Sequence, residues 1–315
     1  MDAGTIALVQ TLVNGALLGC LFGCIALGLT IKWGLLGVAD FSHISLTVIA
    51  AYLTYTVAAD VGLSPFAALL LTVPAFFLVG VLLQLGLVRI RAAVFTTLLI
   101  TFGLFIAAES LVSLVWSSDL LNLRPTLPDA LRQPLRLPEP LDRVAFQPVD
   151  LLSLVAALVM VGGSAYLLRK TRHGRALHAM HQDAAVAEVF GVRLVPLAVV
   201  VSGLAAASAA VSGTLVALKL SLTPTLSASW LGIVVVSCLL GGLGRPVGAL
   251  LAAVLLMMVQ NAWSLYLSPT WAPAIAYGVL FAYLGAAPLF RAVSTRMAAT
   301  RPAAPRLAAP AATRS

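Results

Sequence analysis

The stretch from Asn14 to Tyr52, NGALLGCLFGCIALGLTIKWGLLGVADFSHISLTVIAAY, contains two long apolar runs separated by a short polar interruption. An apolar run of about 18 or more residues is long enough to cross the ~30 Å hydrocarbon core of a bilayer as a helix. Asp40 and His43 stand in the interruption, three residues apart. The stretch therefore predicts two successive membrane spans with a polar break between them.

The composition of the whole chain extends this prediction. Of its 315 residues, 61% are hydrophobic and 10% are charged, and the mean hydropathy is +1.05, whereas soluble domains carry about 25% charged residues. Apolar runs occur at about residues 5–31, 42–59, 64–86, 93–116, 149–168, 197–219, 229–241, 246–266 and 271–290. We expect an all-α polytopic membrane protein. Because the short runs 229–241 and 246–266 can be counted in different ways, the expected number of transmembrane segments is about 8–9, some of them broken or re-entrant.

Basic residues are distributed unevenly between the predicted loops. If the N-terminus lies outside and the spans alternate, most of the 19 Lys and Arg residues fall on the inner side, and this bias orients membrane proteins. The same alternation predicts a cytoplasmic C-terminus. The net charge of +8 is therefore a topology signal with some attraction to anionic headgroups, so we expect membrane lipid and not nucleic acid as a partner.

The chain divides into a transmembrane domain, residues 1–294, and a tail, residues 295–315. The tail is rich in Ala, Pro and Arg, and this composition predicts a disordered segment. Within the domain, the proline-rich residues 117–150 are predicted to form an extracytoplasmic loop with little regular structure. That loop either covers the outer opening of the transmembrane domain, contacts a partner or is a passive connector.

The longest polar stretch of the predicted transmembrane domain on its inner side is the cytoplasmic loop, residues 169–196. Apolar or small residues recur there at spacings of three and four, which places them on one face of a helix. They are Leu177, Met180, Ala184, Ala187 and Phe190. Gly191 is a plausible helix stop. The pattern predicts a short amphipathic helix along the cytoplasmic membrane surface, which either rests at the interface or receives the force of a cytoplasmic partner.

Enzyme motifs do not occur in the chain. The three lysines each follow a residue other than glycine, so there is no Walker A motif, and neither H-E-x-x-H nor G-x-S-x-G is present. The four histidines form no convincing metal set. We therefore expect no catalytic residue and no metal site, and any ATP used must bind to another chain. An intramembrane enzyme using His43 with Asp40 would lack a further catalytic partner.

Asp40 has two interpretations. A carboxylate inside the bilayer is costly unless it is paired or hydrated, so such a group is a candidate functional residue; the same applies to Glu109. Alternatively, Asp40 caps the N-terminus of a helix that begins beside it.

Glycines mark two further features. Gly15, Gly19 and Gly23 form a small-residue stripe that favours close helix packing. The segment with Gly241, Gly242, Gly244 and Pro246 is a helix break, which either lines a cavity or forms a tight turn between two helices. Leu-Leu-Gly precedes this break and also the one near Asp40, as a weak internal repeat.

Three stretches, in this order, resemble the permease subunits of branched-chain amino-acid ABC importers, in particular the LivH type. The first is Asn14 to Tyr52, with Asp-Phe-Ser-His at 40–43. The second is RHGRALHAMHQDAAVAEVFGV, Arg172 to Val192, and the third is LGGLGRPVGALLAAVLL, Leu240 to Leu256. The resemblance covers nearly the whole chain.

The resemblance implies a bacterial inner-membrane permease for branched-chain or other hydrophobic amino acids. It would form the translocation path with a second permease subunit, take substrate from an extracytoplasmic binding protein, and be driven by two ATP-binding subunits that hold ATP and Mg²⁺, with no cofactor in this chain. The implied ATPase-coupling residues are Arg175, Ala179, Asp183, Ala184 and Gly191. From the polar and glycine breaks described above, the candidate residues of the translocation path or helix break are Asp40, Phe41, Ser42, His43, Gly241, Gly242, Gly244 and Pro246.

Two alternatives stay open on the residues alone. The first keeps the same importer class with an amide or urea as substrate. The second is a stand-alone secondary carrier of a small polar solute, in which Asp40 and Glu109 bind protons or sodium.

Overall fold

The computed structural model describes residues 3–117, 120–136, 145–268, 271, 274–275 and 277–283. The chain divides into two compact units, residues 1–277 and 278–315. The second unit is described only at 278–283, which are helical. The predicted tail, 295–315, and half of the predicted ninth span, 271–290, lie outside the described residues.

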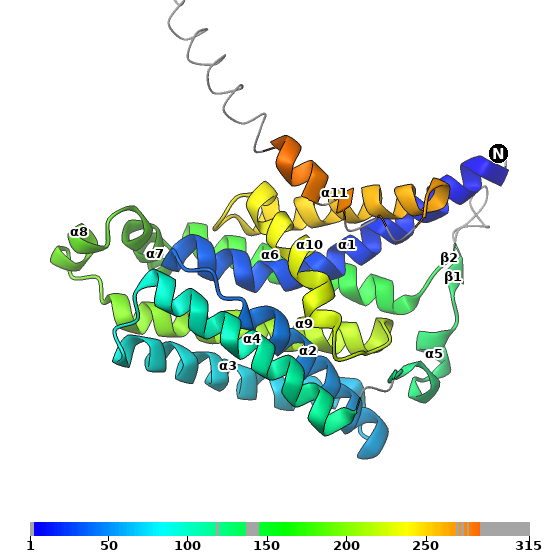
Figure 1. Ribbon diagram of the computed structural model, residues 1–315, viewed down its shortest axis with the longest axis horizontal. Coiled ribbons are helices and arrows are strands. Elements are labelled where there is room, and N and C mark those ends of the chain that lie inside the picture. The colour runs from blue at the N-terminus through cyan, green and yellow to red at the C-terminus, as the bar shows by residue number, and fades with distance from the viewer. Residues whose placement is uncertain are drawn as a thin grey trace, which may run out of the picture. The chain divides into compact units, whose positions relative to one another are not determined.

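The first unit is built from helices (Figure 1). The long ones are α1 (Ala3–Leu36), α2 (Ser42–Tyr55), α3 (Pro65–Arg89), α4 (Val94–Trp116), α6 (Pro148–Lys170), α9 (Leu194–Lys219), α10 (Leu226–Gly241) and α11 (Pro246–Tyr266). The short ones are the π-turn η1 (Thr56–Asp60), the 3₁₀-turn η2 (Arg124–Thr126), α5 (Asp129–Arg132), α7 (Arg172–Gln182) and α8 (Ala184–Val189). A two-stranded pair joins β1 (Leu135–Arg136) to β2 (Ala145–Phe146).

The prediction of an all-α polytopic membrane protein is confirmed. Within the described residues, 7 helices are long and apolar enough to span a membrane, and α10 is a shorter apolar helix. Some boundaries differ from the prediction. The first helix continues past residue 31 to Leu36 and so includes Lys32, whereas α6 begins at Pro148, beside the predicted start at 149. Helices α9 and α10 begin at Leu194 and Leu226, before the predicted starts at 197 and 229. The N–H of the first residue of a helix has no helical carbonyl as a partner. Proline, which has no N–H, therefore loses no hydrogen bond there, and this explains why α6 begins at Pro148.

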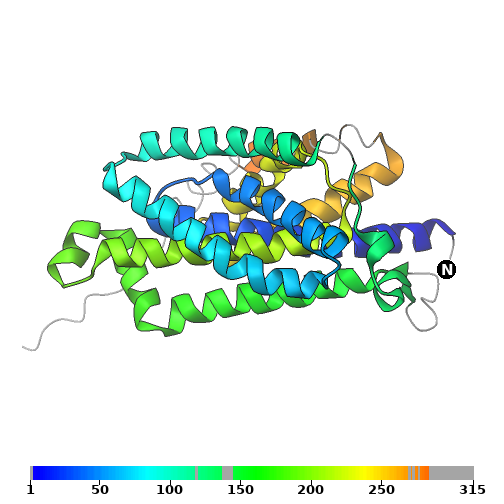
Figure 2. The ribbon, with the colours of Figure 1, turned by 90° about the horizontal axis from the view of Figure 1, so that it is seen from below.

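The connections gather at two ends of the helix bundle (Figures 1 and 2). The α7 end holds the connections 37–41, 90–93, 171–193 and 242–245, and the β1 end holds 61–64, 120–136, 145–147 and 220–225. Backbone hydrogen bonds tie connections at each end to one another or to a helix: Leu121 pairs with Leu222 at the β1 end, and the Gly244 N–H donates to the Thr30 carbonyl at the α7 end. This grouping matches the alternation of spans that the charge pattern predicts.

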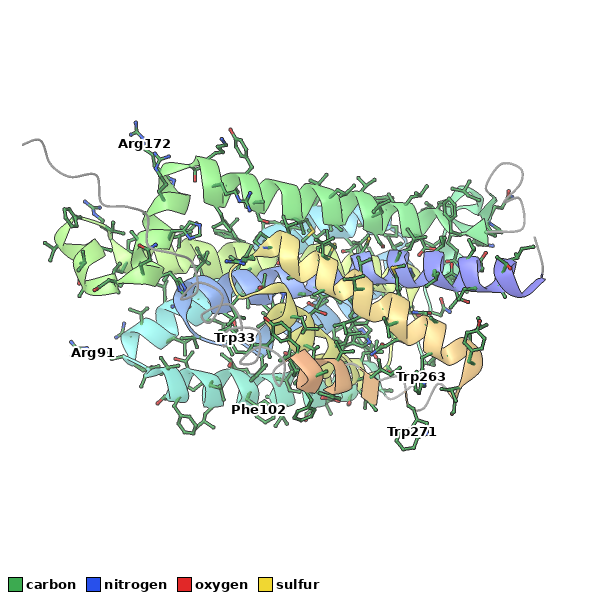
Figure 3. All side chains as sticks on the ribbon, turned by 90° about the horizontal axis from the view of Figure 1, so that it is seen from above. Trp33, Arg91, Phe102, Arg172, Trp263 and Trp271 are labelled. Atoms are coloured by element: carbon green, nitrogen blue, oxygen red, sulfur yellow. The ribbon has the colours of Figure 1, made fainter. Side chains whose placement is uncertain are left out.

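Burial separates central helices from peripheral ones. In the most apolar window of α1, 72% of the residues are buried, compared with 17% in α4. Leu70, Phe95 and Leu114 are among the exposed apolar side chains of α3 and α4, as expected for faces that contact lipid. Figure 3 shows the side chains of Arg91 and Arg172 at the α7 end of the bundle.

The predicted glycine stripe of α1 packs on α11. A Cβ atom at Gly15 would lie 2.8 Å from Cα of Met258, and one at Gly19 would overlap the backbone of Val254. One turn further, a Cβ at Gly23 would overlap the side chain of Leu250. The contacts step by four residues in opposite directions along the two helices. Glycine at these positions therefore lets two antiparallel backbones approach closely.

Candidate functional site

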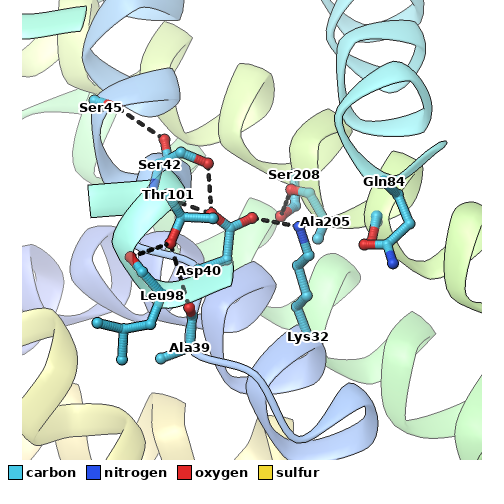
Figure 4. A network of polar contacts seen from close by, with 11 residues as sticks. Lys32, Ala39, Asp40, Ser42, Ser45, Gln84, Leu98, Thr101, Ala205 and Ser208 are labelled. Carbon is cyan, nitrogen blue, oxygen red and sulfur yellow. Dashed lines mark hydrogen bonds and ion pairs between the residues drawn. The ribbon is translucent and has the colours of Figure 1, made fainter. Parts of the chain in front are cut away.

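The polar interruption after α1 folds around a buried ion pair (Figure 4). Gly37 adopts φ +72°, a left-handed conformation that glycine accommodates without steric cost, and the chain turns back along α1. This turn brings the Asp40 carboxylate against the ammonium group of Lys32. The two residues are only 4% and 5% exposed. A charge held so far from water requires a partner, and each provides the other's.

The Asp40 carboxylate also starts α2. Its Oδ1 accepts the backbone N–H of Ser42 at 3.1 Å and the hydroxyl of the same residue. The N-cap residue of α2 is Phe41, which has no side-chain cap. Asp40 precedes it and satisfies an N–H of the first turn as in an Asx turn, so Asp40 has both this local contact and a charge partner. The predicted first span ends at residue 31, before Lys32, so the sequence does not predict this pair.

His43 faces a different neighbour from Asp40. Its side chain is 2% exposed, and Nε2 lies 3.0 Å from the carbonyl oxygen of Ile25. A carbonyl only accepts, so Nε2 carries the proton and donates it. The ring fills space left by Gly28, where a Cβ would overlap it. His43 therefore joins α2 to α1 and is not oriented toward Asp40 as one half of a catalytic pair.

The connecting segment is also held against α4. The Thr101 hydroxyl donates to the carbonyl of Ala39 at 3.5 Å, and the Phe41 ring packs edge-on against that of Phe102, with centroids 6.1 Å apart. The segment is therefore fixed between α1 and α4.

The glycine break between α10 and α11 is a tight turn. Gly242 and Gly244 have φ values of +86° and +75°, and a Cβ at Gly241 would overlap the backbone of α11. A Cβ at Gly34 would likewise overlap the backbone of Gly244. The turn therefore sits directly on the last turns of α1, and Pro246 begins the next helix. Of the two interpretations of this break, the structure shows the turn.

A cavity of about 380 Å³ opens at the α7 end beside the ion pair. It lies between the ends of α1 and α3, the starts of α4 and α9, and the pair α7–α8. Its polar lining residues are Lys32, Gln84, Arg91, Thr97 and His181, and its apolar ones include Leu35, Leu36, Leu87, Val88, Met180, Leu194 and Val195. Asp40 and His43 lie behind this lining, so only Lys32 connects the ion pair to the cavity.

The predicted amphipathic helix of the loop 169–196 is in fact two helices. The chain is extended at Asp183, with φ −156° and ψ +104°, between α7 and α8. The Asp183 carboxylate accepts the Val186 N–H at 3.0 Å and so caps α8. This local hydrogen bond competes successfully with a continuous helix. α8 then ends beside Gly191, which has φ +84°, as the sequence predicts.

The apolar face of the loop divides at the same point. Leu177 and Met180 pack against Leu35, Leu168 and Val201 of the bundle, so α7 contacts protein. By contrast, Ala187 of α8 is buried but the apolar side chains where α8 ends project outward: Val189 is 86% exposed and Phe190, the residue after the helix, 83%. Of the implied coupling residues, Arg175, Asp183, Ala184 and Gly191 are exposed and Ala179 is half-buried.

Glu109 lies far along α4 from Asp40. Its carboxylate is half-buried and 3.5 Å from the hydroxyl of Ser227 on α10. Toward the β1 end, Asp150 forms an ion pair with Lys219. The structure therefore does not bring Glu109 and Asp40 together into one site. Among the described residues, no group of three or more His, Cys, Asp or Glu side chains is arranged to hold a metal ion.

Comparison with known proteins identifies the family. Residues 11–284 match the model of the branched-chain amino acid transport system / permease component family. This chain belongs to that family. Over 290 residues it is 23% identical to the high-affinity branched-chain amino acid transport system permease protein BraD of Pseudomonas aeruginosa, covering 88% of this chain and 92% of BraD. It is 24% identical, with the same coverage, to LivH of Salmonella typhimurium, which carries the same description. No solved structure matches the chain significantly.

The family places the described features in a transport permease. It is not an enzyme family, and its members are components of transport systems. The ion pair, the glycine turn and the loop with α7 and α8 each belong to one of the three stretches on which the resemblance rested, and the structure places these three features toward the α7 end (Figure 1).

Proposed function

We propose that the chain is the inner-membrane permease subunit of an ATP-driven importer for branched-chain amino acids. In this proposal the α7 end and the C-terminus face the cytoplasm. The chain forms the translocation path with a second permease subunit. Two ATP-binding subunits, which hold the ATP and Mg²⁺, bind at the α7 end. An extracytoplasmic binding protein delivers substrate to the β1 end.

The arrangement of α8 is the observation that carries this proposal, together with the family. α7 is anchored to the bundle through Leu177, whereas α8 presents Val189 and Phe190 outward beside the exposed Asp183. Exposed apolar side chains beside an exposed charge are typical of a protein–protein contact. A partner that binds α8 would transmit force through α7 to α1 and α9, because α7 packs against α8, α1 and α9.

The stand-alone carrier is not favoured. An ion-coupled carrier needs a carboxylate that exchanges its ion with the aqueous phase. Asp40 is instead bound by Lys32 and Ser42, and Glu109 lies apart from it. The family also consists of transport-system components.

Reconstitution tests the proposal. The chain is co-expressed with the second permease, the ATPases and the binding protein, and L-leucine uptake into proteoliposomes is measured with and without ATP. Import that requires ATP and all partners is the expected result. Uptake by the lone chain driven by an ion gradient would instead establish the carrier.

Two variants test the coupling residues in the same assay. Asp183→Arg and Gly191→Trp should abolish import and leave the chain in the membrane. Gly86→Trp, at an exposed glycine with open space around it, is the matched control and should import normally. Normal import by both coupling variants would refute the assignment.

A further inference from the structure

The cavity at the α7 end combines two kinds of lining. Its walls are mainly aliphatic, from Leu35, Leu87 and Leu194 among others. The ionisable groups that line it are Lys32, Arg91 and His181, and no carboxylate lines it in the described part of the chain. A cavity with cationic donors, no acidic group and aliphatic walls fits a small organic carboxylate with a branched aliphatic side chain.

Lys32 is the donor at the buried end of this cavity. It is 5% exposed, and its present partner, Asp40, lies behind the lining. Gln84 also lines the cavity, on the side of Lys32 away from Asp40 (Figure 4). Its amide oxygen accepts the Ser202 hydroxyl at 2.8 Å, which leaves its NH₂ group as the available donor. An ammonium and an amide NH₂ thus border the same space.

We propose that this cavity is an amino-acid site in which the ammonium group of Lys32 exchanges the Asp40 carboxylate for the α-carboxylate of the substrate. The inference rests on the proposed function and identifies the ammonium group of Lys32 as the group that recognises the substrate carboxylate. When the site is empty, Asp40 neutralises the buried lysine, which would otherwise be costly inside the membrane. When the site is filled, the substrate carboxylate takes that place and Gln84 donates to its second oxygen, while the last carbonyls of α1, at Leu35 and Leu36, accept from the α-ammonium group. The released Asp40 carboxylate keeps its hydrogen bonds from Ser42, and the aliphatic walls hold the side chain.

The proposal distinguishes amino acids from the amide and urea alternatives. An amide presents a neutral oxygen, which forms a weaker hydrogen bond to an ammonium than a carboxylate does. It therefore cannot displace Asp40 from Lys32. Asp40, for its part, competes with the substrate, so weakening Asp40 should strengthen substrate binding. A purely structural ion pair would not produce this effect.

Equilibrium binding of radiolabelled L-leucine tests the proposal. The complete transporter is reconstituted in nanodiscs without nucleotide and without the binding protein. We expect Lys32→Gln to weaken binding about tenfold or more, the range for a lost hydrogen bond to a charged group. Asp40→Asn should bind more tightly than wild type. Lys170→Gln, at an exposed lysine of the same end, is the matched control and should bind as wild type does. L-leucinamide should compete poorly.

The outcomes separate this inference from the proposed function. If wild type imports leucine but Lys32→Gln binds it normally, or if L-leucinamide competes as well as L-leucine, the inference is wrong and the proposed function stands. If wild type imports no amino acid with all partners present, both are wrong. Should either single variant fail to assemble, the double variant K32Q/D40N removes both charges together. Loss of binding in an assembled double variant supports the proposal, and retained binding overturns it.

Discussion

Gly19→Ala in α1 tests the packing of α1 on α11. The added methyl group would overlap the backbone at Val254 and lie 3.1 Å from the carbonyl oxygen of Ala253. Both neighbours are backbone atoms, so no side-chain rotation relieves the contact and the helices must separate. In a membrane, apolar burial does not hold two helices together, and close van der Waals packing is the main attraction.

The expected loss follows from two opposing effects. Alanine favours a helix over glycine by about 1 kcal/mol in water. Adding a methylene to a well-packed site costs about 1–3 kcal/mol, and the rigid backbone contact places Gly19 toward the upper part of that range. We therefore expect Gly19→Ala to lower the free energy of unfolding by about 1–2 kcal/mol.

Two other glycines calibrate this result. Gly103 of α4 has nothing within 4 Å of an added Cβ, so Gly103→Ala should be neutral or stabilising by up to about 1 kcal/mol. An added Cβ at Gly23 meets first the end of the Leu250 side chain, which can rotate. Gly23→Ala should therefore fall between the other two variants.

Equilibrium unfolding by SDS in mixed micelles provides the assay, followed by tryptophan fluorescence. Trp230 is a suitable reporter because its ring packs on Phe22 of α1, with centroids 5.5 Å apart. If Gly19→Ala is as stable as Gly103→Ala, α1 and α11 do not pack through the glycine stripe, and the arrangement described above is wrong.

Four further predictions concern separate contacts. Lys32→Gln and Asp40→Asn each leave a buried charge unpaired and should lower the free energy of unfolding by about 3–5 kcal/mol. The double variant should be more stable than either single variant. If the two losses add in a double-mutant cycle, the two residues are not paired. Thr214→Val removes a hydroxyl 3.1 Å from that of Thr54 and should cost about 0.6 kcal/mol, by the same SDS assay. Gly191→Ala forces a side chain into φ +84° and should cost about 1 kcal/mol, visible as faster hydrogen exchange in α8 and not in α7. Phe190→Ser should leave the unfolding of the lone chain unchanged, because the ring is 83% exposed, yet reduce co-purification of the ATPase subunits; equal recovery would argue against α8 as their contact.

Local features of the sequence predicted local features of the structure. Apolar runs located the seven long helices, because length and hydropathy alone decide whether a segment can span a bilayer. Gly191 marked the end of α8 because a left-handed residue favours glycine in any fold. The prediction of one continuous helix in the loop 169–196 was wrong for a reason that is also local. Asp183 caps α8, and an aspartate inside an amphipathic pattern indicates that one helix can end and another begin there.

Pairings between distant residues required the tertiary structure. The stripe from Gly15 to Gly23 predicted close packing but not α11 as the partner, since any apolar helix offers an equivalent surface in lipid. Lys32 and Asp40 were both visible in the sequence, but only the turn at Gly37 and the continuation of α1 to Leu36 place them in contact. The sequence by itself determined that charges stand between two spans. The fold determined that they neutralise each other beside a cavity, because their separation depends on the path of the backbone and not on their spacing along it.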